Sequence, residues 1–374
     1  MRIEDFKLEQ WLNPRDASCD YNLGASCVKA FTFNEMLEFV GENPEEILKD
    51  IGEMSLHYGE FDGSDRVRKA IAGIYEKATP DKVLTVHGGS GANNMVITEL
   101  TEAGDNVVAI TPNYQQHYSI PKNLGIEVRE HRLKPDNGFL PNIEELRKLV
   151  DKNTKIISLT NPNNPSGAYT REGLLREMVE LAREVDAYIL CDEIYRGLDE
   201  EYMPSIVDVY EKGISTSSMS KVYSMAGTRI GWIVTRNEKA YEQLFNRRSY
   251  DTVSCGVIDE LLTSIALENN EKILERSRQI VRKNKAILDK WMETQPKLKY
   301  CADSYGSTVL MKYDYDIPTE KFCADVLDEK GVLLCHGECF EEPNTFRLGY
   351  GFDGEETLVT GLKLLGEFLE SLDK

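Results

Sequence analysis

The chain has 374 residues, 41% hydrophobic and 29% charged, which is typical of a globular protein and not of a disordered one. Its 44 Lys and Arg face 64 Asp and Glu, and the net charge of -20 disfavours nucleic acid and anionic membranes as partners. The opening MRIEDFKLEQWLNPRD mixes charges and lacks the apolar run of a signal peptide, and no later stretch is long enough to span a bilayer. We therefore expect a cytoplasmic protein.

Four short apolar runs predict buried strands, namely KVLTVHG, NVVAITP, KIISLTNP and AYILCDE. Between them lie segments with helical apolar spacing, such as GANNMVITELTEAGD and TREGLLREMVELAREVD. This alternation predicts an α/β fold in which helices flank a mostly parallel central sheet, from about Lys82 to Val234.

After Ala240 the chain changes to long charged helical stretches, with short strands near STVLMKYD and TFRLGYG. We expect a large ligand-binding domain at residues 34–255 and a small α+β domain at residues 256–374. Residues 1–33 carry too little pattern to fold alone, so we expect an arm that joins the small domain or a neighbouring subunit.

The eight cysteines are scattered, and a chain of this size needs no disulfides, so we expect them to be reduced and mostly buried. The closest pair is Cys335 and Cys339, in CHGEC. A zinc site would need a further Cys/His pair, and none accompanies them. We expect no metal.

Polar residues collect where the predicted strands end, which is where open α/β sheets bind ligands. The first strand runs into GGSGANN, so Gly89, Ser90 and Gly91 predict a phosphate cradle at a helix start. The stretch HGGSG is similar to an esterase oxyanion loop, but Ala92 stands where that motif requires glycine. It also lacks the lysine of a P-loop.

Four polar side chains follow the later strands. Tyr114 offers either an interfacial hydroxyl or a flat face for a ring. Asn164, in the rigid turn NPNNPSG, is placed to donate to a ligand oxygen. Asp192 ends a wholly apolar strand and needs a partner, a helix N-cap or a ligand, which Tyr195 could also address.

The segment SSMSKVYSMAGTRIGW places Lys221 among serines and before Arg229. Hydroxyls and an arginine around a lysine predict an anion site with a nucleophile beside it, although most lysines only solvate a surface.

With NPNNPSG, DEIY and SSMSKVYSMAGTRIGW in this order and spacing, the chain resembles the class I/II aminotransferases over nearly its whole length. These are pyridoxal-phosphate enzymes of fold type I. The resemblance implies the aspartate aminotransferase fold, pyridoxal 5'-phosphate as cofactor, and an amino acid and a 2-oxo acid as substrates. It also implies a homodimer with shared active sites.

The resemblance also assigns roles. Lys221 matches the lysine that forms a Schiff base with the cofactor, Asp192 the partner of the pyridine nitrogen, and Tyr195 and Asn164 the donors to its phenolic oxygen. Tyr114 matches the stacking aromatic ring. The resemblance also implies cofactor contacts, mostly to the phosphate, at Gly89, Ser90, Gly91, Ser218, Ser220, Arg229 and the neighbouring subunit's Tyr58, and a substrate carboxylate contact at Arg347. We also expect Asn164 and Gly24 to contact the substrate.

Several alternatives stay open at this stage. The cofactor motifs also suit β-elimination at a C–S bond, decarboxylation or cyclisation, or a cofactor-binding sensor. We expect Arg248 to be a solvated surface residue, the alternative being a side-chain selector in a neighbour's pocket. The segment LGASCVKAFTF departs from the family's Gly/Pro-rich opening, and we expect Gly24 to Val28 to line the substrate pocket. His117 either supports Asp192 or is structural.

Overall fold

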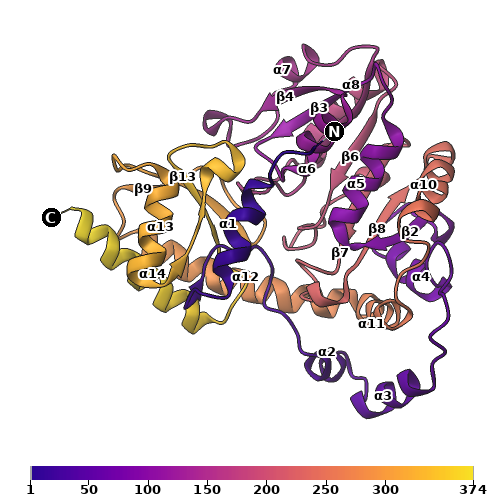
Figure 1. Ribbon diagram of the computed structural model, residues 1–374, viewed down its shortest axis with the longest axis horizontal. Coiled ribbons are helices and arrows are strands. Elements are labelled where there is room, and N and C mark those ends of the chain that lie inside the picture. The colour runs from indigo at the N-terminus through magenta and orange to yellow at the C-terminus, as the bar shows by residue number, and fades with distance from the viewer. Residues whose placement is uncertain (1, 374) are drawn as a thin grey trace.

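A seven-stranded sheet forms the centre of the larger part of the molecule in the computed structural model, which describes residues 2–373 (Figure 1). The strand order is β2-β8-β7-β6-β5-β3-β4; β8 is antiparallel to both neighbours, and the other pairings are parallel. The strands are β2 (Val83–His87), β3 (Asn106–Thr111), β4 (Glu127–Arg132), β5 (Thr154–Thr160), β6 (Tyr188–Asp192), β7 (Gly213–Ser218) and β8 (Ile230–Thr235). The mostly parallel α/β fold and the four predicted strands are confirmed.

Helices cover both faces of this sheet, because neighbouring side chains of most of its strands enter two different apolar cores. Val107 and Ile156 belong to one core, and the next residues, Val108 and Ile157, belong to the other. The first core contains side chains of α5 (Gly88–Leu100), α6 (Gln116–Leu124) and α10 (Glu238–Asp251), and the second those of α4 (Asp65–Ala72), α7 (Ile143–Arg147), α8 (Glu172–Glu184), α9 (Ile206–Val209) and α11 (Val257–Glu268).

The smaller part has its own antiparallel sheet, in the order β12-β13-β10-β9, and a two-stranded parallel sheet, β1-β11. Residues of the N-terminal arm therefore pair with a strand of the C-terminal part. The elements are α1 (Lys7–Asp16), β1 (Tyr21–Asn22), β9 (Leu298–Tyr300), β10 (Thr308–Tyr313), α13 (Thr319–Lys330), β11 (Val332–Leu333), β12 (Cys335–His336), β13 (Thr345–Gly349) and α14 (Glu355–Leu372).

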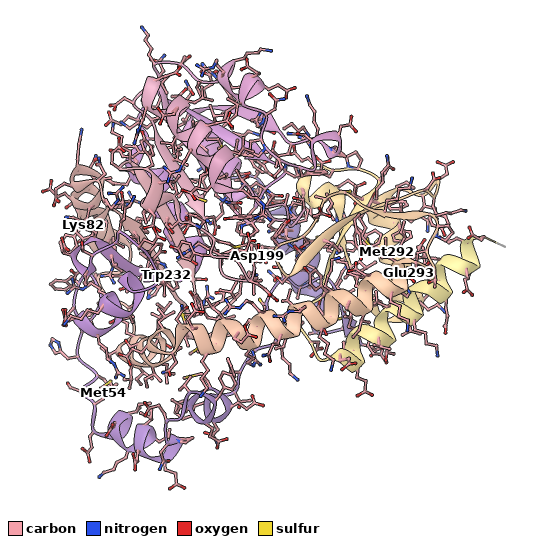
Figure 2. All side chains as sticks on the ribbon, turned by 180° about the vertical axis from the view of Figure 1, so that it is seen from behind. Met54, Lys82, Asp199, Trp232, Met292 and Glu293 are labelled. Atoms are coloured by element: carbon pink, nitrogen blue, oxygen red, sulfur yellow. The ribbon has the colours of Figure 1, made fainter. Side chains whose placement is uncertain are left out.

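The long helix α12 (Asn270–Met292) runs across the molecule and joins the two parts (Figures 1 and 2). Just before it, α11 packs against α4 of the larger part. The division after residue 255 stays a prediction, and this packing favours a boundary inside α12. Two further helices, α2 (Phe33–Val40) and α3 (Pro44–Glu53), project from the larger part, and α2 begins with a capping box between Thr32 and Glu35.

Between Arg2 and Asp373, every helix is too short or too polar to cross a membrane. All eight cysteines are free thiols, and five of them, Cys191, Cys255, Cys323, Cys335 and Cys339, are buried.

Arg248 does not lie on the surface, and the expectation of a solvated arginine is wrong. Its side chain on α10 is 1% exposed. Nε donates to the carbonyl oxygen of Thr85 at 2.6 Å, Nη2 donates to the Thr85 hydroxyl at 3.1 Å, and Nη1 donates to the Val253 carbonyl. The guanidinium therefore ties α10 to strand β2 and to the loop before α11, and it is engaged within its own chain.

We predict that Arg248→Met lowers the free energy of unfolding by about 2–4 kcal/mol, because it leaves buried acceptors without donors. The matched control is Arg247→Met. That neighbour pairs with Asp251 at 3.2 Å near the surface, and its loss should cost less than about 1 kcal/mol. Chemical denaturation followed by circular dichroism compares the two variants, and equal losses would contradict the structural role of Arg248.

Candidate active site

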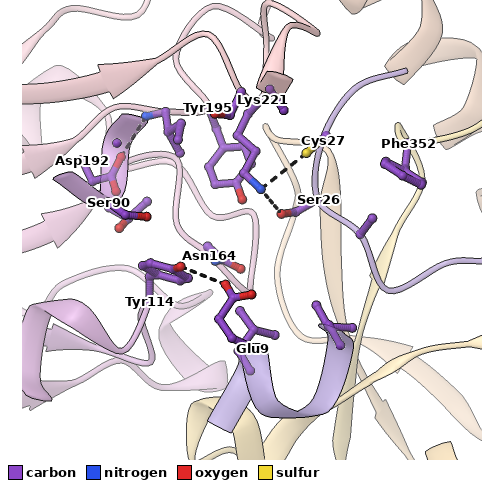
Figure 3. Close-up of a pocket in the computed structure, with 18 of the residues that line it drawn as sticks. Glu9, Ser26, Cys27, Ser90, Tyr114, Asn164, Asp192, Tyr195, Lys221 and Phe352 are labelled. Atoms are coloured by element: carbon purple, nitrogen blue, oxygen red, sulfur yellow. Dashed lines mark hydrogen bonds between the residues drawn. The ribbon is translucent and has the colours of Figure 1, made fainter. Parts of the chain in front are cut away.

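A cavity of about 340 Å³ lies at the carboxyl ends of the parallel strands, between the two parts of the chain (Figure 3). Most of the residues singled out in the sequence line it together: Gly89, Ser90, Tyr114, Asn164, Asp192, Tyr195, Ser220, Lys221, Arg229 and Arg347. Motifs that are far apart in the sequence thus lie together at the edge of the sheet where α/β folds bind ligands.

Asp192 is held as a buried carboxylate at the end of β6. Its Oδ1 accepts the backbone N–H of Ile194 at 3.1 Å, and its Oδ2 accepts from Nδ2 of Asn93 at 2.8 Å. Nε2 of the fully buried His117 lies 3.9 Å from Oδ2. His117 therefore stands beside Asp192, and its other ring nitrogen lies 2.5 Å from the Ser158 hydroxyl.

Lys221 reaches into the cavity from the turn after β7. Its Nζ donates to the Ser26 hydroxyl at 2.9 Å and lies 3.6 Å from the sulfur of Cys27 (Figure 3). Burial disfavours the charged amine, but the thiol of Cys27 and the hydroxyl of Tyr195 outweigh this and raise the pKa of Lys221 above its ordinary value. The expected pocket segment thus contributes Ala25, Ser26 and Cys27 to the cavity.

One end of the cavity suits an anion. Helix α5 begins at Gly88, earlier than the sequence predicted, so its first N–H groups and the positive end of its dipole face the cavity near Gly89 and Ser90. A Cβ on Gly88 would lie 2.7 Å from Nη2 of Arg229, and one on Gly89 would lie 3.7 Å from the Ser218 hydroxyl. A guanidinium and a hydroxyl therefore adjoin the helix start.

The cavity lining contains a second guanidinium, that of Arg347. Arg347 is 1% exposed; its Nη1 donates to Oδ1 of Asn164 at 2.9 Å, and its Nη2 donates to the carbonyl oxygen of Gly24 at 2.6 Å. Its Nε is buried and has no partner in the described part of the chain. Because the Asn164 oxygen is occupied by Arg347, the amide nitrogen of Asn164 remains free to donate to a ligand.

Four of the proposed site residues are not part of the cavity lining. Gly24 contacts Arg347 through its carbonyl, Ser218 lies buried behind Gly89, and Gly91 lies within α5. Tyr58 is 73% exposed and lines a separate groove with Leu56 and residues 254–259. Within one chain, Tyr58 is not brought to the cavity.

Two residues that the sequence analysis missed matter most here. Asn93 stands three positions after Ser90, so helical spacing alone could have placed it on the same face of α5. It also accepts from the Thr216 hydroxyl at 2.6 Å, which fixes its amide toward Asp192. Glu9, on α1, accepts the hydroxyl of Tyr114 at 2.9 Å (Figure 3). No local sequence motif predicts a role for Glu9, because only the packing of the N-terminal arm brings it to the cavity.

The CHGEC segment places Nε2 of His336 3.3 Å from the sulfur of Cys339. Within residues 2–373, no group of three or more His, Cys, Asp or Glu is arranged to hold a metal ion.

Comparison with known proteins gives a consistent result. Residues 22–359 match the family described as aminotransferase class I and II. A crystal structure of a PLP-dependent aminotransferase from Streptococcus suis is 41% identical, covers all of both chains and superposes with a TM-score of 0.97. The aspartate/prephenate aminotransferase of Thermus thermophilus is 28% identical over 82% of each chain. Capreomycidine synthase of Streptomyces vinaceus is 26% identical over 97% of this chain and 93% of its own.

The fold and the cavity define a class of protein that binds an anionic ligand at a helix start, beside a lysine and a buried carboxylate. The chain belongs to the aminotransferase class I and II family and is a pyridoxal-phosphate-dependent aminotransferase, as its motifs predicted.

We predict that Gly231→Ala weakens cofactor binding at least about tenfold and destabilises the protein by about 1–3 kcal/mol. A Cβ at this position would lie 2.3 Å from the backbone carbon of Gly88 and would push away the start of α5. Gly227→Ala is the control, because a Cβ there meets nothing within 4 Å. Titration with pyridoxal phosphate and thermal melting would test this, and unchanged affinity in Gly231→Ala would contradict it.

Proposed function

We propose that this cavity holds pyridoxal 5'-phosphate and that Lys221 is the catalytic amine in transfer of an amino group between an amino acid and a 2-oxo acid. The observation that carries the proposal is the convergence of Lys221, the buried carboxylate of Asp192 and the anion site at Arg229 in one cavity. When bound, the cofactor supplies an electron sink for the negative charge that develops at the substrate Cα.

The residues present fit this cofactor. Its phosphate suits the first turn of α5, the hydroxyl of Ser220 and Arg229, while Ser218, behind Gly89, accepts the backbone N–H of Ser220 at 3.2 Å. Asp192 faces the cavity as an anion partner for a pyridine nitrogen, with Asn93 and His117 behind it. The free amide nitrogen of Asn164 and the hydroxyl of Tyr195 are the donors for its phenolic oxygen, and Tyr114 offers a ring face. The phosphate, the pyridine nitrogen and the phenolic oxygen of the cofactor thus each have a suitable polar partner in the cavity.

Lys221 then has two tasks. Because its raised pKa favours the protonated amine, Lys221 would have to lose a proton before it could act as the nucleophile that holds the cofactor. Its Nζ, at the cavity wall, would also be the group that accepts the proton from the substrate Cα. Ser26 and Cys27 hold Nζ at the cavity wall before substrate arrives. Arg347 binds the substrate carboxylate, since its planar fork presents paired donors and its Nε is still unused.

We predict that the purified protein, mixed with pyridoxal phosphate, shows a visible absorbance band that amino acids convert to a near-ultraviolet band without any 2-oxo acid. Lys221→Ala should abolish both the visible band and turnover, because no other lysine lines the described cavity. Lys239→Ala, an exposed lysine on α10, should behave as wild type. A visible band that persists while pyruvate and ammonia accumulate would instead establish β-elimination.

We also propose a homodimer with shared active sites. In the single chain, Leu56 is 80% exposed, Tyr58 73% and Tyr250 81%, and Tyr58 borders a groove that is lined mainly by apolar atoms of residues 254–259. Large apolar side chains gathered around a groove favour burial against a second copy. The partner's surface would then bring Tyr58 to the cofactor phosphate.

We predict a particle of twice the 42.5 kDa chain mass in light scattering, and complementation between two weak variants. Tyr58→Ala and Lys221→Ala each damage one contributor to a shared site. After unfolding and refolding as a mixture, half the dimers should be mixed, so roughly a quarter of all sites regain both residues. Recovery of activity supports shared sites, whereas no recovery in a confirmed mixed dimer would mean that Tyr58 does not serve its partner.

A further inference from the structure

Helix α1 lies against the cavity and is fixed to both parts of the chain. Nε1 of Trp11 donates to the carbonyl oxygen of Leu334 in the smaller part at 2.7 Å. On the other side, the backbone N–H of Lys7 donates to Oε1 of Gln115 at 2.8 Å, and the ring of Phe6, just before the helix, lies 4.8 Å from that of Tyr114. The helix is therefore a rigid wall of the cavity, with its side chains held in defined positions.

The polar face of α1 carries acidic groups toward this cavity. Glu9, Asn13 and Asp16 follow one another at spacings of four and three residues, so they share one face of the helix, and all three line the cavity. One oxygen of Glu9 accepts the Tyr114 hydroxyl, and Oδ1 of Asp16 accepts Nδ2 of Asn22 at 2.5 Å. In residues 2–373 neither carboxylate has a Lys, Arg or His partner, and the second oxygen of each accepts no hydrogen bond.

Glu9 and Asp16 are charged groups of the cavity that the proposed function does not use. The cations that line the cavity are Lys221, Arg229 and Arg347, and the proposed function uses each of them, for the cofactor carbonyl, the phosphate and the substrate carboxylate. The sequence offered Arg248 as an alternative partner for a substrate side-chain carboxylate, but its guanidinium donates hydrogen bonds to Thr85 and Val253. Within residues 2–373, the cavity thus has no further cation for an acidic substrate side chain, but it has two carboxylates, Glu9 and Asp16, that the proposed function does not use.

We infer that Glu9 and Asp16 select an amino-acid substrate whose side chain ends in a cation, an ammonium or a guanidinium. This inference rests on the proposed function, because it takes Arg347 as the anchor of the substrate carboxylate. The buried, unpartnered Nε of Arg347 marks that anchored end, and α1 supplies the wall that the side chain meets. Charge-assisted hydrogen bonds to a carboxylate are strong enough to discriminate a cation from its neutral isostere.

The test compares cationic amino acids with neutral isosteres in the half-reaction of the cofactor-loaded protein. Arginine against citrulline and lysine against norleucine are followed through loss of the visible band, and kcat/KM is measured for each. Wild type should favour the cation at least about tenfold in one of the two pairs. Glu9→Gln should lower that ratio about tenfold while the kcat/KM of the neutral isostere stays nearly constant, and Asp16→Asn should lower it by a smaller factor because Asp16 is more exposed.

Two controls separate selection from a structural role of Glu9. Asp5→Asn removes the same charge from the arm outside the cavity and should leave the ratio unchanged. Tyr114→Phe removes the hydrogen bond to Glu9 but keeps its carboxylate, so the preference for the cation should survive. No preference in wild type, or an unchanged ratio in both Glu9→Gln and Asp16→Asn, would overturn the inference alone. If no amino acid of any kind converts the band, the proposed transamination fails, and the inference fails with it.

Discussion

The orientation of Asp192 and Tyr195 in the cavity depends on one buried carboxylate, that of Glu193. Its Oε1 accepts from the Ser205 hydroxyl at 2.8 Å and from the backbone N–H of Ile206 at 2.7 Å, and its Oε2 accepts from the Ser215 hydroxyl at 2.8 Å and lies 3.1 Å from Nε of Arg196. Burial raises the pKa of Glu193, but Arg196 and these donors oppose that rise, so the carboxylate is compensated. Because Glu193 is fixed beneath the sheet edge, the residues before and after it in the same turn, Asp192 and Tyr195, are turned toward the cavity.

The two halves of the site belong to different parts of the chain, and a few contacts hold them in register. Asp192 and Lys221 follow strands of the seven-stranded sheet, whereas Arg347 lies on β13 of the smaller sheet. Asn164 reaches across to Arg347, and the Ser307 hydroxyl donates to the carbonyl oxygen of Ser26 at 2.6 Å. A shift of the smaller part would therefore move Arg347, the proposed substrate anchor, relative to Asp192 and Lys221.

The sequence predicted well which residues meet in the cavity, because most of them stand in short local motifs. A glycine-rich helix start, a carboxylate after an apolar strand and a lysine between hydroxyls each appear within a few residues, and strand order alone brings them together. Arg248 and Glu9 could not be placed in this way. Arg248 lies in a polar, weakly amphipathic stretch that predicts an exposed position, yet the loop before α11 buries it. Glu9 reaches the cavity only because the arm folds back over strands that are distant in the sequence.

This division explains why the family motifs identify the chemistry but not the substrate. The cofactor end is built by strand ends and the first turn of α5, where a change disturbs the core of the sheet. The proposed substrate end is built by α1 and the Ser26–Cys27 segment, and α1 is held in place by the buried side chains of Leu8 and Trp11. Leu8 on the cavity face of α1 belongs to the larger core. The polar residues Glu9, Asn13 and Asp16 belong to neither core, so the charge at these three positions can change without disturbing the packing. Two carboxylates and a buried arginine in one cavity suit a substrate with a negative end and a positive end.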